Sequence, residues 1–176
     1  MASKPSLALK RRFKASPAQL FQAWTQPEKM ICWWGVTGHP KTPIAEADVR
    51  VGGRFRVQFH TPDGAHHSVS GVYREVVPDR RLVFSWAWQS TPERESQVTI
   101  DLNPVADGTM LTLTHEQFYD EKARDSHRVG WNHFFDRLER AGKEVVLSTL
   151  AAPATVRERR SIADLCGDER LVEIND

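Results

Sequence analysis

The sequence predicts an α+β domain in which a curved antiparallel sheet of about seven strands wraps around one long C-terminal helix, with two short helices after the first strand. Three observations support this. Apolar residues alternate with polar ones through most of residues 42–117, two short helical patterns precede that region, and one long amphipathic pattern follows it. A sheet with one apolar face needs a cover, and the long helix can supply it.

The first strand and the two short helices are indicated by local patterns. In residues 6–13, "SLALKRRF", apolar side chains alternate, as in a strand. Ser16 is a favourable N-cap, and Pro17 suits the first position of a helix that extends to about Trp24. A second short helix is expected from about Pro27 to Cys32.

The period changes to two at Thr42 and stays so for most of the next 75 residues. Gly52-Gly53 interrupts the first alternating run, which predicts a two-residue hairpin because such turns need positive φ angles. Further strands are expected over 68–77, 81–88, 96–102 and 110–118. Asp-Gly pairs or proline mark several of the turns between them.

The long helix is expected from about residue 120 to beyond residue 140. At ~100° per residue, its inward side chains fall within an arc of about 100°; they are His127, Trp131, Phe134, Phe135 and Leu138. We therefore expect one domain over residues 1–142. Residues 143–176 would form a C-terminal extension that is helical or partly disordered.

The composition excludes several classes of protein. The chain has 176 residues, of which 40% are hydrophobic and 27% charged, and a formal net charge of +1. Lysines and arginines are scattered among carboxylates, which argues against nucleic acid as a partner. The first residues lack the apolar run of a signal peptide, and no run is long enough to span a membrane, so a cytoplasmic location is expected. A homodimer is possible.

Enzyme signatures are missing from the sequence. It contains no Gly-rich phosphate loop, Gly-x-Ser-x-Gly, His-Glu-x-x-His or Cys-x-x-Cys motif. No cofactor and no metal are expected, since two separate cysteines, Cys32 and Cys166, do not make a zinc site. His115, at the end of the last strand, and His127, on the inner face of the long helix, could meet as a hydrogen-bonded pair or contact a ligand. His115 and Tyr73 are the candidates for any catalysis.

The interior aromatic residues have two interpretations. They could simply fill the core, or the curved sheet could leave an apolar cavity beside the helix, with a few polar groups to orient a ligand. On the second interpretation the ligand-binding residues are Trp34, Phe55, Phe59, Tyr73, Phe84, Trp86, His115, His127, Trp131 and Phe135.

The order of the motifs resembles a known family. The motifs are "SPAQLFQAWTQPEKMICWWG", "ADVRVGGRFRVQF", "SGVYREVVPDRRLVFSWAW", "SQVTIDL", "GTMLTLTHEQF" and "RVGWNHFFDRL". Together, over about Leu7 to Ala141, they resemble the Aha-type family, named for an activator of the heat-shock protein 90 ATPase. This family belongs to the START-related SRPBCC superfamily with the helix-grip fold. Val36 departs from the proline that relatives often carry there.

The resemblance implies a deep pocket between the sheet and the long helix. Trp33 would then pack against the short helices, while Trp34 would lie at the rim of the cavity. The function implied is binding of a small hydrophobic molecule without catalysis. The alternatives are a cyclase- or aromatase-like or hydrolytic enzyme that uses a pocket histidine, and a regulator of a chaperone ATPase. A role in the stress response is a further expectation.

Overall fold

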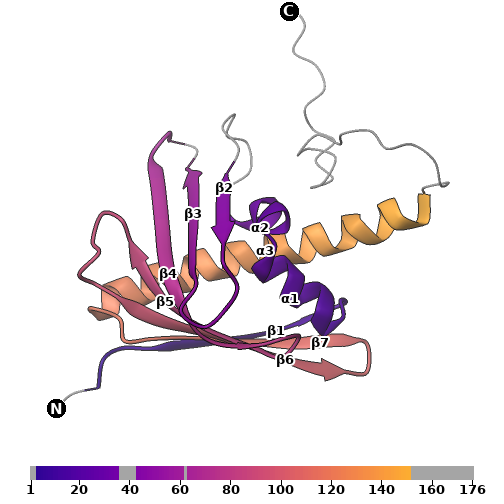
Figure 1. The fold of residues 1–176 in the computed structure, drawn as a ribbon, viewed down its shortest axis with the longest axis horizontal. Coiled ribbons are helices and arrows are strands. Elements are labelled where there is room, and N and C mark those ends of the chain that lie inside the picture. The colour runs from indigo at the N-terminus through magenta and orange to yellow at the C-terminus, as the bar shows by residue number, and fades with distance from the viewer. Residues whose placement is uncertain (1–2, 36–42, 62, 152–176) are drawn as a thin grey trace, which may run out of the picture.

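The computed structural model describes residues 3–35, 43–61 and 63–151, and their side chains as far as residue 142. Seven antiparallel strands form one sheet in the order β1-β7-β6-β5-β4-β3-β2, and three helices complete the fold (Figure 1). The elements are β1 (Leu7–Phe13), α1 (Pro17–Thr25), α2 (Pro27–Trp33), β2 (Ile44–Ala47), β3 (Arg54–His60), β4 (His66–Val77), β5 (Arg81–Trp88), β6 (Ser96–Val105), β7 (Gly108–Glu116) and α3 (Glu121–Ala151). The predicted fold class is confirmed.

Local sequence explains the two short helices. The Ser16 hydroxyl accepts a hydrogen bond from the Gln19 backbone N–H at 3.2 Å, and the Gln19 side chain accepts one from the Ser16 N–H at 2.9 Å. This capping box, with Pro17 at the first turn, fixes the start of α1. Pro27 starts α2 in the same way, so both predicted helices are confirmed.

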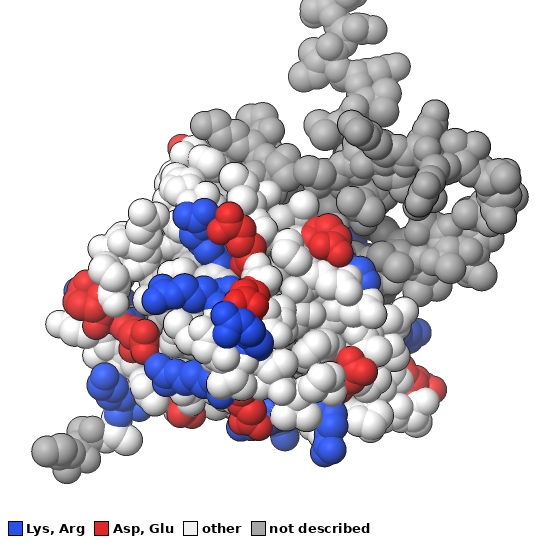
Figure 2. Space-filling view, in the orientation of Figure 1, with Lys and Arg blue, Asp and Glu red and all other residues white. Residues whose placement is uncertain are grey.

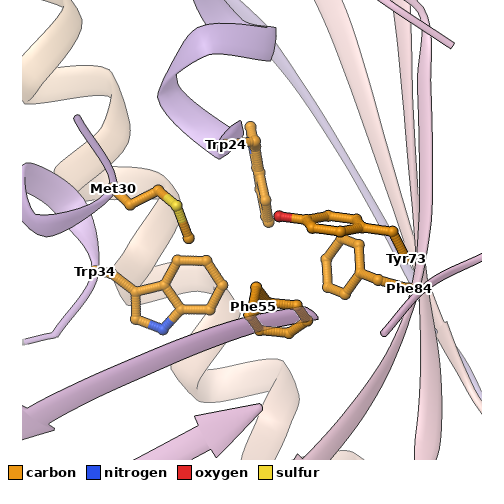
Figure 3. Close-up of a pocket in the computed structure, with 6 residues that line it drawn as sticks. All are labelled: Trp24, Met30, Trp34, Phe55, Tyr73 and Phe84. Atoms are coloured by element: carbon orange, nitrogen blue, oxygen red, sulfur yellow. The ribbon is translucent and has the colours of Figure 1, made fainter. Parts of the chain in front are cut away.

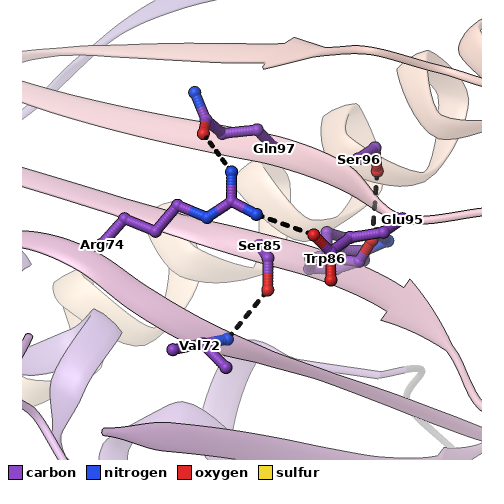
Figure 4. A network of polar contacts seen from close by, with 7 residues as sticks. All are labelled: Val72, Arg74, Ser85, Trp86, Glu95, Ser96 and Gln97. Carbon is purple, nitrogen blue, oxygen red and sulfur yellow. Dashed lines mark hydrogen bonds and ion pairs between the residues drawn. The ribbon is translucent and has the colours of Figure 1, made fainter. Parts of the chain in front are cut away.

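The sheet is strongly bent, and its β2–β4 end stands steeply against the rest (Figure 1). The register between β4 and β5 shifts between Tyr73 and Glu75. Next to this irregularity, the Ser85 hydroxyl accepts a hydrogen bond from the Val72 N–H at 2.9 Å (Figure 4). Arg74 reaches across β5 and donates to Gln97 at 2.8 Å. The Ser85 side chain thus takes the place of a ladder hydrogen bond where the sheet curves.

Helix α3 covers the concave face of the sheet. Its inward residues Trp131, Phe135 and Leu138 are buried, as the helical spacing predicts. Polar contacts also attach α3 to the end of α2 and to β1. Arg137 donates to the Gly35 carbonyl at 2.9 Å, just after α2, and Arg11 of β1 donates to Asp136.

The connection from β2 to β3 differs from the prediction. It covers residues 48–53 and is therefore longer than a two-residue hairpin. The reason is that its end pairs with β4: the Gly52 N–H donates to the Tyr73 carbonyl at 2.8 Å, and the Tyr73 N–H donates to the Gly53 carbonyl at 2.9 Å. A Cβ on Gly53 would lie 1.9 Å from the Asp48 carbonyl oxygen, so this close turn requires glycine.

Two expectations fall at the edge of the described chain. Helix α3 continues to Ala151, past the expected domain boundary at residue 142. The rest of the expected C-terminal extension, residues 152–176, and the atypical Val36 lie outside the described residues.

Candidate functional site

One space inside the fold is closed by aromatic side chains. Between the sheet, α1 and α2, the residues around it leave no room for a water molecule; they are Trp24, Met30, Trp34, Phe55, Tyr73 and Phe84 (Figure 3). The Tyr73 hydroxyl points into the middle of this group, toward Trp24 (Figure 3). We call these six residues the inner cluster.

The paired tryptophans follow α2 into the core. Trp33 is 1% exposed and donates its indole N–H to the Ala23 carbonyl at 2.8 Å, so its predicted packing against the short helices is confirmed. The prediction that Trp34 lies at a rim is wrong, because its side chain is also 1% exposed. Its ring stacks on that of Trp86, with ring centres 5.7 Å apart, and contacts the Trp131 ring edge-on at a centre-to-centre distance of 6.2 Å. Trp34 therefore fills the interior.

A second space remains open at the other end of the sheet. It has a volume of about 120 Å³ and lies between the end of β5, the turn into β6 and the start of α3. We call it the β5–α3 cavity. Its lining consists of Trp86, Trp88, Thr91, Arg94, Ser96, Phe118, Tyr119, Ala123 and His127.

His127 is held in one tautomer in the wall of this cavity. The Trp88 indole N–H donates to His127 Nε2 at 3.0 Å. An indole can only donate, so the imidazole proton lies on Nδ1, which donates to the Ala123 carbonyl at 2.7 Å. Both ring nitrogens are therefore used in the neutral form.

His115 lies behind the cavity and is fixed in the opposite tautomer. The Trp131 indole N–H donates to His115 Nδ1 at 3.1 Å. The proton on Nε2 then donates to the Ser96 hydroxyl at 2.7 Å, and that hydroxyl donates to the Trp86 carbonyl at 3.2 Å (Figure 4 shows this last bond). This chain of hydrogen bonds ties β7 to β6, β5 and α3.

The two imidazoles meet edge to face, with ring centres 5.0 Å apart. Each is bonded to an indole, so the hydrogen-bonded histidine pair considered from the sequence does not form. Burial lowers the pKa of His115 well below its ordinary value, and the neighbouring His127 lowers it further. Burial also lowers the pKa of His127. Both therefore stay neutral near pH 7.

The ten predicted ligand-binding residues divide into several groups. Four belong to the inner cluster, namely Trp34, Phe55, Tyr73 and Phe84. Two line the β5–α3 cavity, namely Trp86 and His127, and the buried His115 and Trp131 stand behind them.

The other two predicted residues lie elsewhere. The Phe59 ring meets Trp88 at 6.2 Å but does not line the cavity. Phe135 packs edge to face on Phe13 of β1 at 5.8 Å, under the Arg11 guanidinium. The core aromatic residues thus do not surround a single pocket.

Sequence reasoning missed most of the β5–α3 cavity. Trp88 was identifiable, because it follows Trp86 at the alternate position of β5 and faces the same side. Phe118 and Tyr119 stand between the last strand and the long helix, which places them near the helix start. Thr91 and Arg94 come from a charged turn with no distinguishing pattern.

The described residues hold neither a candidate metal site nor a candidate membrane-spanning helix. No three histidine, cysteine, aspartate or glutamate side chains there converge in a way that could hold a metal ion. Within the same residues, no helix combines the length and the apolar character needed to cross a membrane.

Comparison with known proteins supports the same architecture. The family model described as "Activator of Hsp90 ATPase homolog 1-like protein" matches residues 14–143. None of the curated proteins matches the chain.

Solved structures with the same fold come from several bacteria. The AHSA1 protein from Silicibacter pomeroyi is 26% identical, with a TM-score of 0.66 over 82% of this chain and 99% of that one. A protein from Rhizobium leguminosarum is 27% identical, with a TM-score of 0.65 over 79% and 94%. For a protein from Chromobacterium violaceum, 24% identical, the TM-score of 0.67 over 76% and 94% shows the shared fold alone. With the family model covering most of the sequence, the chain belongs to the Activator of Hsp90 ATPase homolog 1-like family.

Proposed function

We propose that this protein binds a small apolar molecule, about the size of one aromatic ring, in the β5–α3 cavity and does not transform it. The observation that carries the proposal is the cavity itself, with a volume of about 120 Å³ between two indoles and a phenyl ring. An engineered protein cavity of about 150 Å³ is large enough to bind benzene. The β5–α3 cavity is somewhat smaller, which limits a ligand held inside it to about one ring.

The lining has the character of a ligand site. Trp86, Trp88 and Phe118 provide flat apolar walls, and the polar side chains of Thr91, Arg94, Ser96, Tyr119 and His127 complete the lining. Trp88 and His127 bond to each other, so the wall is held in place before any ligand arrives. A preorganised wall reduces the entropy lost on binding.

The closed inner cluster sets the upper limit of ligand size. A molecule of several rings would have to displace Trp34 from its contacts with Trp86 and Trp131. Burial of such a side chain stabilises the fold by about 1.5–3 kcal/mol, and displacement of the ring would remove this stabilisation. A single-ring ligand avoids this cost.

Catalysis has less support from the geometry. Both nitrogens of His115 are engaged in hydrogen bonds and its side chain is 0% exposed. Tyr73 is buried in the inner cluster, where desolvation raises the pKa of its hydroxyl far above the ordinary value. Neither group meets a substrate in this conformation. Regulation of a chaperone ATPase, which the family description names, stays an alternative that stimulation of that ATPase would test.

The other expectations about partners and location remain predictions. On the face shown in Figure 2, lysine and arginine side chains are interspersed with carboxylates, consistent with the expected absence of nucleic-acid binding. A homodimer and a cytoplasmic location stay predictions from the sequence.

A pair of substitutions on α3 tests the site. Ala123 lines the cavity, and Ala123→Phe should fill it. We expect single-ring compounds such as benzamide and benzoate to bind the wild type by calorimetric titration, and Ala123→Phe to weaken that binding at least tenfold.

Val129→Phe is the matched control, because Val129 is 60% exposed on the same helix and does not line the cavity. It should bind as the wild type does. Absence of binding to the wild type, or equal binding by Ala123→Phe, would contradict the proposed function.

A further inference from the structure

One charged side chain lines the β5–α3 cavity, and it is basic. Among the residues that line it, Arg94 carries a full charge and none is a carboxylate. The other polar groups of the lining are uncharged. They are the hydroxyls of Thr91, Ser96 and Tyr119, the indole N–H groups of Trp86 and Trp88, and the neutral imidazole of His127. A cavity with such a lining favours a ligand that carries a negative charge or strong acceptors.

Arg94 is held at the edge of the cavity by an aromatic ring. Its guanidinium carbon lies 4.1 Å from the centre of the Tyr119 ring, which is within cation–π range. Tyr119 also lines the cavity and is 62% exposed, so the pair stands where the cavity meets solvent. The stacking restricts the long arginine side chain before a ligand arrives.

The guanidinium keeps its hydrogen-bonding capacity for a ligand. Its one ion-pair partner in the described chain is the adjacent Glu93, with Nε and Oε1 3.5 Å apart, and the structure gives this side chain no hydrogen bond. An exposed pair of this kind contributes little. A ligand carboxylate could therefore engage the planar fork of Arg94 through two parallel hydrogen bonds.

Neighbouring carboxylates are occupied by other partners. Glu95 pairs with Arg74 at 2.7 Å, and Asp125 pairs with Arg124 at 2.9 Å. Asp120 caps the start of α3 by accepting from the Ala123 N–H at 2.7 Å. Glu93 is the carboxylate that pairs with Arg94 in the structure.

We propose that the ligand is a small aromatic carboxylate, whose ring lies between Trp86, Trp88 and Phe118 and whose carboxylate binds Arg94. This rests on the proposed function and adds to its apolar ring one anionic group, the carboxylate. Arg94 is then the residue that determines specificity, while the apolar walls contribute affinity for any ring of this size.

The test compares two compounds of nearly equal shape at pH 7, benzoate and its neutral analogue benzamide. Calorimetric titration of the wild type should give at least tenfold tighter binding of benzoate. Arg94→Gln should remove that preference, because it weakens the binding of benzoate far more than that of benzamide.

Arg12→Gln serves as the matched control. Arg12 has a similar side-chain exposure, 50% against 44% for Arg94, and one carboxylate partner, Asp107, and it does not line the cavity. It should keep the full preference for benzoate. Equal binding of the two compounds by the wild type would overturn this inference alone, as would a preference that survives in Arg94→Gln. Failure of both compounds to bind would overturn the proposed function together with it.

Discussion

At the scale of single residues, the two histidine–tryptophan pairs are the most informative feature. Each indole N–H points at an imidazole nitrogen, at 3.0 Å for Trp88 and His127 and at 3.1 Å for Trp131 and His115. Both nitrogens of a protonated imidazole are donors, so protonation would place an imidazole N–H opposite the indole N–H and break the hydrogen bond. The neutral histidine is therefore part of the folded structure.

A pH dependence of stability follows from these pairs. Both folded-state pKa values are lowered, so the unfolded chain binds protons that the folded chain does not. The stabilisation is full above the unfolded pKa of about 6.5 and is lost as the pH falls below it, by up to about 1.4 kcal/mol per pH unit for each histidine. Urea unfolding at pH 7.5, 6.5 and 5.5 should show this fall.

His115→Gln tests the assignment of the pH effect. Glutamine keeps one acceptor for Trp131 and one donor for Ser96 but does not titrate in this range. The fall in stability between pH 7.5 and 5.5 should be smaller than in the wild type, whereas His133→Gln, at an exposed position of α3, should leave it unchanged. An unaltered pH dependence in His115→Gln would mean that other groups cause it.

At the scale of elements, the bend between β4 and β5 depends on a glycine. A Cβ on Gly71 would lie 1.8 Å from the Ser85 backbone carbonyl oxygen and 2.6 Å from the Phe55 ring. Moving the Ser85 backbone to make room for a methyl group costs free energy. Gly71→Ala should therefore lower the free energy of unfolding by roughly 2–4 kcal/mol, measured by thermal or urea unfolding.

Gly130 is the matched control, because a Cβ there meets nothing within 4 Å in the middle of α3. Gly130→Ala should stabilise the protein by about 1 kcal/mol through helix propensity. If Gly71→Ala unfolded at the same urea concentration as the wild type, the close contact between Gly71 of β4 and Ser85 of β5 would be contradicted.

The attachment of α3 to the sheet gives another prediction. Trp131 is fully buried, packs on Trp24 and Trp86, and bonds to His115. Trp131→Ala should therefore lower the unfolding free energy by about 3–5 kcal/mol. Val129→Ala, at an exposed position two residues earlier, should change it by less than about 0.5 kcal/mol. An unchanged urea midpoint in Trp131→Ala would place Trp131 outside the core.

The elements themselves were predictable because their periodicity is strong. Alternation in β5 and helical spacing in α3 placed Trp86 and Trp131 correctly on inner faces. The position of Trp34 was not predictable, since its ring direction depends on how the chain leaves α2. The β5–α3 cavity was missed for a similar reason: its position depends on how Arg94 and Tyr119 pack, and periodicity does not contain that information.

At the scale of the whole molecule, the bent sheet and α3 enclose two unlike regions. Tryptophan and phenylalanine side chains close the region near α1 and α2, while the end near the start of α3 keeps a cavity of about 120 Å³. Trp86 separates the two regions, because it stacks on Trp34 and also lines the cavity. The fold thus combines a closely packed core with one small open cavity among the described residues.

The most direct test of this account is a titration with benzamide, followed by NMR of the six tryptophan indole N–H signals, each assigned with a Trp→Phe variant. We expect the signals of Trp86 and Trp88, which line the cavity, to shift in a saturable way. The signal of Trp33, bonded to the Ala23 carbonyl, should stay fixed. Shifts confined to Trp24 and Trp34 would place the ligand in the inner cluster and contradict the account, as would the absence of any shift.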